Sequence, residues 1–443
     1  MKPRAERQAD GVDRRRVVRR VDQAEWAPAR TRADPVALIE KTNAERLPKL
    51  VPIKMGRMAT SPFSFFRGAA PVMAADLAAL PTTGLRVQLC GDAHVQNIGA
   101  FAAPDGHLVF DLNDFDETIP GPWEWDLKRL AASFVLAGRE AGVPDGTCSD
   151  AARALVASYR EAMARFADMT MMDLLRVEVA RHVRRGPVHD ALVKAERVTP
   201  LRALERLTVA AGDRRLFHDE PPLLEHVPDS TAGAVIAALR EYRETLGPDR
   251  QLLLDSYEPH DVAFKVVGTG SVGTHDYVVL CYGADPADPL IVQVKEELVS
   301  CYAAFLPEGP AFAHQGRRVA EGQHRMQSAC DALLGWTTLE GRDYLVRQLS
   351  DHKARVDTEH LRRGGLLAYA TVAGEILGKG HARTGDSVAI AAYCGRTGKL
   401  DKAIARFATA YAEQTEADHA RFVEAVRSGR IPALPDRRHT QRP

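Results

Sequence analysis

The segment from Cys90 to Glu117 constrains the fold of this chain more than any other. It consists of a polar loop, Cys90–Asn97, then an apolar run, then a second polar turn, Asp111–Glu117. Carboxylate and amide side chains that follow one another in this spacing are suited to hold a divalent metal ion and to face phosphate groups. The residues that we expect to carry this chemistry are Asp92, Asn97 and one or both of Asp111 and Asp114.

Alternating apolar residues on either side of the loop predict two short strands, 85–89 and 108–112, which would flank it as a hairpin. Further along, Asp126 is expected to cap the amino end of a helix that is rich in apolar residues. The interpretation without chemistry is an Asx turn at Asp92 followed by a solvated acidic turn at 113–117.

The loop resembles the HGDxHxxN loop of the aminoglycoside and choline kinase branch of the protein-kinase-like phosphotransferases, with Cys90 in place of the leading His. That resemblance implies that Asp92 accepts the proton of an acceptor hydroxyl and that Asn97 holds a Mg²⁺ ion. Asp114 begins a pair that resembles the Asp-Phe of the kinase metal motif, whereas Asp111 lies at the predicted strand end. The sequence leaves both open as the main metal ligand.

A glycine-rich turn lies much later in the chain, between predicted strands at 262–267 and 275–282. A dinucleotide-binding fingerprint needs a helix after its glycines, whereas a kinase-like loop is the tip of a strand hairpin that lies over a triphosphate. The β-rich residues after the turn favour the kinase-like loop, and an ordinary tight hairpin is the structural alternative. The residues expected to cover the nucleotide are Gly268, Gly270, Ser271 and Gly273.

A third predicted strand ends in Lys295 and resembles the VAIK strand, whose Lys contacts the α- and β-phosphates of ATP. A helix predicted over 316–333 contains Glu321, which the resemblance makes the partner of this lysine. Glu296 and Glu297 compete for that role. A solvent-facing strand end is the structural alternative for Lys295.

The order of these parts is unusual for a kinase, because the glycine-rich turn follows the acidic loop instead of preceding it. Circular permutation explains such an order, since new chain ends are tolerated at exposed loops. We therefore predict an α+β fold of two lobes that is protein-kinase-like and circularly permuted, with a small β-rich lobe inserted between helical segments of a large lobe. The expected division is a large, mostly helical lobe over 36–255, a small nucleotide-binding lobe over 256–350, and helices over 351–443 that return to the large lobe.

Two arginine-rich segments lie outside this scheme. The first 35 residues contain Arg14, Arg15, Arg16, Arg19 and Arg20 without an apolar segment after them, which predicts a disordered basic arm and no signal peptide. Arg57 and Arg67 flank a cluster of aromatic residues. They are expected either to bind a phosphate or to neutralise the acidic turn at 116–117.

Ten strings spread from about residue 40 to about 428, among them SPF-x-FFRG, CGDAHVQN, FDLNDFDE and GPWEWDLKRLA, resemble the bacterial domain-of-unknown-function family 2252. The resemblance implies a bacterial, cytoplasmic protein and carries no activity. The kinase-like assignment therefore depends on the residues above.

Composition excludes some classes of partner. Lysine plus arginine and aspartate plus glutamate both number 59, so no global field favours nucleic acid or a membrane surface. The six cysteines form no CxxC pair, which fits a reducing cytoplasm and predicts neither a zinc framework nor a disulfide scaffold.

The function that we expect is an ATP- and Mg²⁺-dependent phosphotransferase acting on the hydroxyl of a small molecule or protein. The alternatives are a metal-dependent phosphohydrolase, a nucleotide-binding pseudokinase that regulates without catalysis, and an AMP transferase that uses the same residues with the nucleotide reversed. The sequence leaves the substrate and the oligomeric state open.

Overall fold

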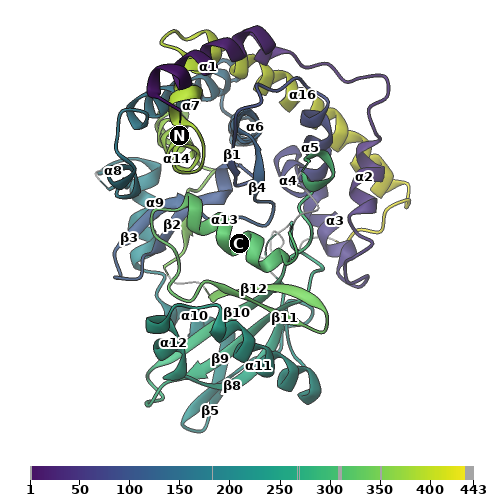
Figure 1. Ribbon diagram of the computed structural model, residues 1–443. Coiled ribbons are helices and arrows are strands. Elements are labelled where there is room, and N and C mark those ends of the chain that lie inside the picture. The colour runs from purple at the N-terminus through teal and green to yellow at the C-terminus, as the bar shows by residue number, and fades with distance from the viewer. Residues whose placement is uncertain are drawn as a thin grey trace.

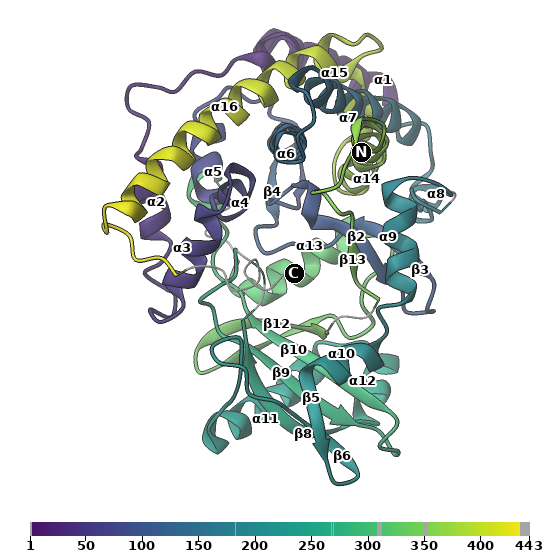
Figure 2. The same ribbon diagram turned by 180° about the vertical axis from the view of Figure 1, so that it is seen from behind.

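The structure is a computed structural model in which residues 2–181, 183–266, 268, 270–307, 312–349 and 352–434 are described. It is a mixed α+β fold. Figure 1 shows a mass of helices above an antiparallel sheet, with α13 (Gln315–Met326) between them. Figure 2 shows the same two parts from behind, with α16 (Lys399–Arg427) arching over the helices.

The helical part is built around three long helices, α6 (Trp123–Glu140), α7 (Asp145–Phe166) and α14 (Arg363–Thr384), and α16 packs on the first two. Trp123 is fully buried and stacks on Tyr159 with ring centroids 5.6 Å apart. Such a stacked pair contributes about 0.5–1.5 kcal/mol beyond the area that it buries. The shorter helices around them are α1 (Arg4–Val17), α2 (Pro35–Lys41), α3 (Val51–Ala59), α4 (Pro62–Gly68), α5 (Ala70–Ala78), α8 (Met171–Leu175), α9 (Pro187–Glu196) and α15 (Ser387–Cys394).

The large sheet has six strands in the order β11-β12-β10-β9-β8-β7. Its strands are β7 (Leu224–His226), β8 (Glu258–Lys265), β9 (Asp276–Tyr282), β10 (Pro289–Glu296), β11 (Gly335–Leu339) and β12 (Arg342–Gln348). Both faces are covered, because β9 and β10 are buried at nearly every position and not at alternate ones. One face packs against α11 (Asp229–Glu244) and α12 (Pro248–Asp255), and the other against α10 (Pro200–Leu207) and the hairpin β5 (Thr208–Ala211) with β6 (Arg214–Phe217).

The secondary structure of residues 200–255 differs from the helical segment that was expected there. Strands β5, β6 and β7 interrupt a segment expected to be helical, and Leu204 and Tyr242 belong to the core of the sheet. The strands that begin near residue 256 bury two apolar faces, and the residues before them supply the apolar surface that covers both.

The amino-terminal segment is also different from the expected disordered arm. Residues Arg4–Val17 form α1, which packs on α15. Arg7 makes a 2.8 Å ion pair with Asp386, and Arg15 Nε donates to the Tyr393 carbonyl at 3.0 Å. Arg20 likewise donates to the Cys394 carbonyl, and such partners are far away in the sequence, whereas Arg16 and Arg19 stay exposed and pair locally with Asp13 and Asp22.

The two strands that flank the acidic loop do not form the predicted hairpin. β1 (Arg86–Leu89) pairs with β4 (Ile119–Pro122), while β3 (Leu108–Leu112) pairs with β2 (Ile98–Ala102), and β13 (Ala354–Arg355) adds to β2. The sequence pattern located the strands at 86–89 and 108–112, but not their partners. Among the described residues, no helix combines the length and the apolar character that crossing a membrane requires.

Candidate active site

A cavity of about 500 Å³ lies between the helical part and the sheet. Its lining brings together polar side chains from segments that are far apart in the sequence. Asp92, Asn97 and Asp114 come from the acidic segment, and Gly268, Gly270 and Ser271 come from the glycine-rich turn between β8 and β9. The remaining polar side chains of the lining are Lys41, Thr42, Glu45, Arg46, Lys54, Arg67, His94, Asp116, Glu117, Thr274, Glu296, Glu297, Cys301 and Arg355.

Antiparallel pairing of β2 with β3 explains why Asn97 and Asp114 lie on the same wall. Asn97 ends the 3₁₀ turn η2 (Val95–Asn97) just before β2, and Asp114 follows β3 closely. The amide of Asn113 donates to the Asn97 carbonyl at 2.9 Å, which fixes the start of one strand beside the end of the other. The Asn97 side-chain amide in turn donates to the Asp92 carbonyl at 2.9 Å.

The Asp92 loop is held from behind by α6. Both oxygens of the Asp126 carboxylate accept backbone amides of the loop, from Cys90 at 2.8 Å and Gly91 at 3.1 Å. Asp126 is therefore not the predicted helix cap, because α6 begins at Trp123 and leaves Asp126 inside its first turn. One turn later Arg129 donates from Nε to Asp92 Oδ1 at 2.8 Å.

Burial and Arg129 act in opposite directions on Asp92. Burial raises the pKa of the Asp92 carboxyl above its usual value, and the Arg129 guanidinium works against that rise. Burial also lowers the pKa of His94 well below its usual value. His94 is thus neutral, with Nδ1 accepting the Gln96 amide at 3.2 Å and Nε2 lying 3.5 Å from Asp92 Oδ2.

Lys295 lies at the end of β10 among three acidic side chains. Its ammonium contacts Asp116 and is 3.4 Å from Glu297. Among these acids, burial raises the pKa of Asp114, the lysine lowers that of Asp116, and burial beside Asp116 raises the pKa of Glu297 to about 8. Of the three acids, Glu297 has a pKa above neutral and so carries a proton at pH 7, which a cation bound nearby would displace.

Glu321 does not pair with Lys295. It forms ion pairs on the surface of α13 with Arg317 at 2.7 Å and Arg325 at 3.0 Å. The α13 side chain that does reach the site is Arg318, which donates to the backbone carbonyl of Asp116 at 2.8 Å. The acid in contact with Lys295 is Asp116, and of the three glutamates considered Glu297 lies near it, at 3.4 Å.

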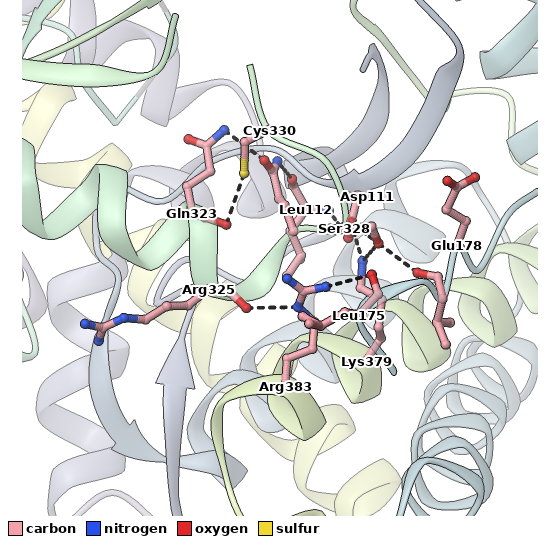
Figure 3. A network of polar contacts seen from close by, with 12 residues as sticks. Asp111, Leu112, Leu175, Glu178, Gln323, Arg325, Ser328, Cys330, Lys379 and Arg383 are labelled. Carbon is pink, nitrogen blue, oxygen red and sulfur yellow. Dashed lines mark hydrogen bonds and ion pairs between the residues drawn. The ribbon is translucent and has the colours of Figure 1, made fainter. Parts of the chain in front are cut away.

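Asp111 lies outside the cavity. It is fully buried in a separate network, where its carboxylate pairs with Lys379 of α14 and accepts the Ser328 amide at 3.1 Å, as Figure 3 shows. Residue 111 points away from the cavity because side chains alternate along β3. Of the two candidate metal ligands, only Asp114 lines the cavity.

The glycine-rich turn is tied to the helical part through its backbone. Gly273 is not among the residues that line the cavity, and its carbonyl accepts the Leu47 amide at 2.7 Å. Arg46 donates to the Val272 carbonyl at 2.7 Å, and Arg57 donates to the Gly268 carbonyl at 2.5 Å. Thr269 lies outside the described residues.

The outcome for the two early arginines differs. Arg57 binds the glycine-rich turn, which neither expected role included. Arg67 lines the cavity and lowers the pKa of Asp92. Binding of a phosphate therefore stays a prediction for Arg67.

Sequence reasoning missed several charged residues of the site: Arg46, Lys54, Arg129 and Arg355. Arg129 had a usable signal, because it follows Asp126 by three residues and so shares its helix face. Arg46, Lys54 and Arg355 had none, since their segments reach the cavity only through long-range packing.

The donor set fits a cation that is held jointly with phosphate. Within the described part of the chain, no group of three or more His, Cys, Asp or Glu side chains is arranged to hold a metal ion. Asn97 and Asp114 offer two oxygen ligands, and Mg²⁺ is commonly bound by one or two side chains together with substrate phosphates and water.

Comparison with known proteins identifies the family. Residues 46–425 match the model of DUF2252, described as an uncharacterized protein conserved in bacteria, and the chain belongs to that family. No curated protein and no solved structure matches the chain.

Proposed function

We propose that the protein is an ATP- and Mg²⁺-dependent phosphotransferase. The single observation that supports this most strongly is the shared cavity: Asp92, Asn97 and Asp114 line the same space as the glycine-rich turn. A proton acceptor, oxygen ligands for a metal and a backbone turn over phosphates are the parts that phosphoryl transfer requires.

In the proposed reaction the acceptor hydroxyl oxygen forms a bond to the γ-phosphorus, the bond from that phosphorus to the β-γ bridging oxygen breaks, and ADP leaves. Asp92 takes the hydroxyl proton on Oδ2, because Arg129 already occupies Oδ1. Mg²⁺, when bound, neutralises charge on the phosphates. Asn97 and Asp114 would hold it, and Lys295 would bind the α- and β-phosphates.

The proposed architecture is that of a circularly permuted, protein-kinase-like fold. In its favour, the chain from β8 to β12 runs in the order glycine hairpin, lysine strand, helix and two further strands. That order matches the small lobe of a kinase. The departure is the acidic partner of the lysine, which is Asp116, with Glu297 at 3.4 Å, in place of a glutamate on α13.

The test is incubation of the purified protein with Mg²⁺ and ATP labelled at the γ- or the α-phosphate. Transfer of the γ-label to an acceptor supports the proposal. Transfer of the α-label would make the protein an AMP transferase, Mg²⁺-dependent release of phosphate from substrates without nucleotide would make it a phosphohydrolase, and tight nucleotide binding without turnover would make it a pseudokinase.

Asp92→Asn tests the base. We expect turnover to fall by about 10²–10⁴-fold, since a positioned base contributes that much, while ATP binding is kept. Asp105→Asn is the matched control, because the Asp105 side chain is 72% exposed and is not part of the cavity lining. Full activity of Asp92→Asn would remove Asp92 from the base role.

A further inference from the structure

Arg46 and Lys54 form a basic pair on the cavity wall beside the glycine-rich turn. Lys54, on α3, is only 1% exposed. Arg46 lies in the loop before α3 and is anchored to the Val272 carbonyl of the turn. A lysine ammonium buried this deeply is rare unless something compensates its charge.

Several acids of the cavity already contact other basic side chains. Asp92 pairs with Arg129, Asp116 and Glu297 share Lys295, and Glu296 is 2.7 Å from both Arg342 and His275. Asp116 and Glu296 also attract Arg46 from a distance, but each already contacts another basic side chain.

The hydrogen bonds of the basic pair end on neutral oxygens. Lys54 donates to Thr42 Oγ1 at 3.3 Å and to Asn43 Oδ1 at 3.2 Å. Arg46 donates to the Val272 and Thr42 carbonyls at 2.7 and 3.2 Å. Burial lowers the pKa of both groups, and Arg46 lowers that of Lys54 further. Burial outweighs the attraction of Glu117 on both groups and of Asp116, Glu296 and Glu45 on Arg46, so an added anion would stabilise the charged forms.

We propose that Arg46 and Lys54 bind an anionic group of the acceptor, so that the acceptor is an alcohol that also carries a phosphate or a carboxylate. This proposal adds the class of acceptor to the proposed phosphotransferase function and rests on that function. Lys295 and the metal ligands serve the nucleotide, and the basic pair, on a different element from either, remains for the acceptor. Lys41, also in the lining, adds positive charge. The basic pair would repel a cationic group, such as that of choline, at this position.

The test measures binding of inorganic phosphate by calorimetry, with and without saturating Mg²⁺ and the non-hydrolysable analogue AMP-PNP. The proteins compared are the full chain without substitution, the variant Lys54→Met and the control variant Lys49→Met. Lys49 is close in sequence, 62% exposed, and paired with Glu225 outside the cavity. Lys54→Gln provides a second variant if the methionine variant does not fold.

We expect Lys54→Met to weaken phosphate binding by about tenfold or more, and to change AMP-PNP affinity by less than about threefold. Without ligand, Lys54→Met should melt at a higher temperature than the full chain, because it removes a buried charge. Glycerol 3-phosphate or glycerate should compete with phosphate, and choline should not.

Equal phosphate affinity in the full chain and Lys54→Met would overturn the proposal. So would a loss of AMP-PNP affinity with unchanged ADP affinity, since the pair would then serve the γ-phosphate, or competition by choline. If AMP-PNP does not bind but phosphate binds through Lys54, the phosphotransferase assignment fails and the anion site stands.

Discussion

At the scale of residues, the acidic segment is held by ion pairs whose members come from different elements. Asp92 meets Arg129 of α6, Asp116 meets Lys295 of β10, and Asp111 meets Lys379 of α14. Breaking such a pair on one side leaves a charge in a medium that solvates it poorly. The pairs therefore fix the conformation of the acidic segment strongly.

The pair of Asp111 and Lys379 allows a direct test of this cost. Both side chains are at most 1% exposed, so we expect Lys379→Met to lower the free energy of unfolding by about 3–5 kcal/mol. Urea denaturation measures it. Replacing both residues by apolar ones should recover most of the loss, and Arg243→Met, at an exposed pair, should cost less than about 1 kcal/mol. If Lys379→Met lowered the free energy of unfolding as little as Arg243→Met does, the expected cost of breaking the buried pair would be wrong.

Glu297 predicts a pH dependence of stability. Its pKa is raised from 4.5 to about 8, so the folded chain keeps a proton that the unfolded chain loses. The stabilisation is complete below pH 4.5 and is lost as pH rises through about 8. We expect Glu297→Gln and the unsubstituted protein to have similar free energies of unfolding at about pH 5, and the variant to be more stable at about pH 9. Denaturation at each pH measures this. A variant that is less stable at every pH would mean an ionised Glu297 paired with Lys295.

At the scale of elements, the loop between β1 and η2 depends on a glycine. Gly91 has φ +86°, and a Cβ there would lie 2.2 Å from the Glu117 carbonyl oxygen. This close approach brings the Asp92 loop against the acidic turn. Asp126 then binds the amide of the same glycine, so α6 and the turn clamp the loop from two sides.

Gly91→Ala is therefore expected to cost more than backbone strain alone. Gly106 has nearly the same φ, +85°, and a Cβ added there would meet nothing within 4 Å, so Gly106→Ala isolates the strain contribution of about 1–3 kcal/mol. We expect Gly91→Ala to lose about 1–3 kcal/mol more through overpacking, and to lose activity. If thermal denaturation showed the same loss of stability for Gly91→Ala and Gly106→Ala, the close approach of residue 91 to the Glu117 carbonyl would have no effect on stability.

At the scale of the whole molecule, the cavity joins the sheet to the helices, so a ligand in it contacts both. A Mg²⁺-nucleotide complex that binds only the folded chain should stabilise it by about 2.7 kcal/mol at a hundred times its Kd. Thermal denaturation with ATP, before and after chelation of Mg²⁺ by EDTA, measures this. The stabilisation should disappear with EDTA and in Lys295→Met, and a Mg²⁺-independent shift would argue against metal ligands at Asn97 and Asp114.

The local patterns predicted much of the secondary structure. The β8–β9 hairpin follows from the β-rich residues of its second strand and from its glycines, and the Lys295 strand from its β-branched residues. Periodicity could not distinguish Asp111 from Asp114, because the answer depends on which face of β3 the cavity meets. Periodicity also could not indicate that Glu297, and not Glu296 or Glu321, lies near Lys295. The resemblance to kinases had placed this acidic residue on a helix.

The sequence by itself determined which short segments carry chemistry, since propensity and side-chain type are properties of neighbouring residues. The tertiary structure alone decided which of these residues meet in one cavity, that Arg129 and Lys295 supply the countercharges, and that Arg46 and Lys54 reach the same space. The physical reason is range: turns and strands follow from contacts a few residues apart, whereas charge compensation and burial depend on segments that only packing brings together.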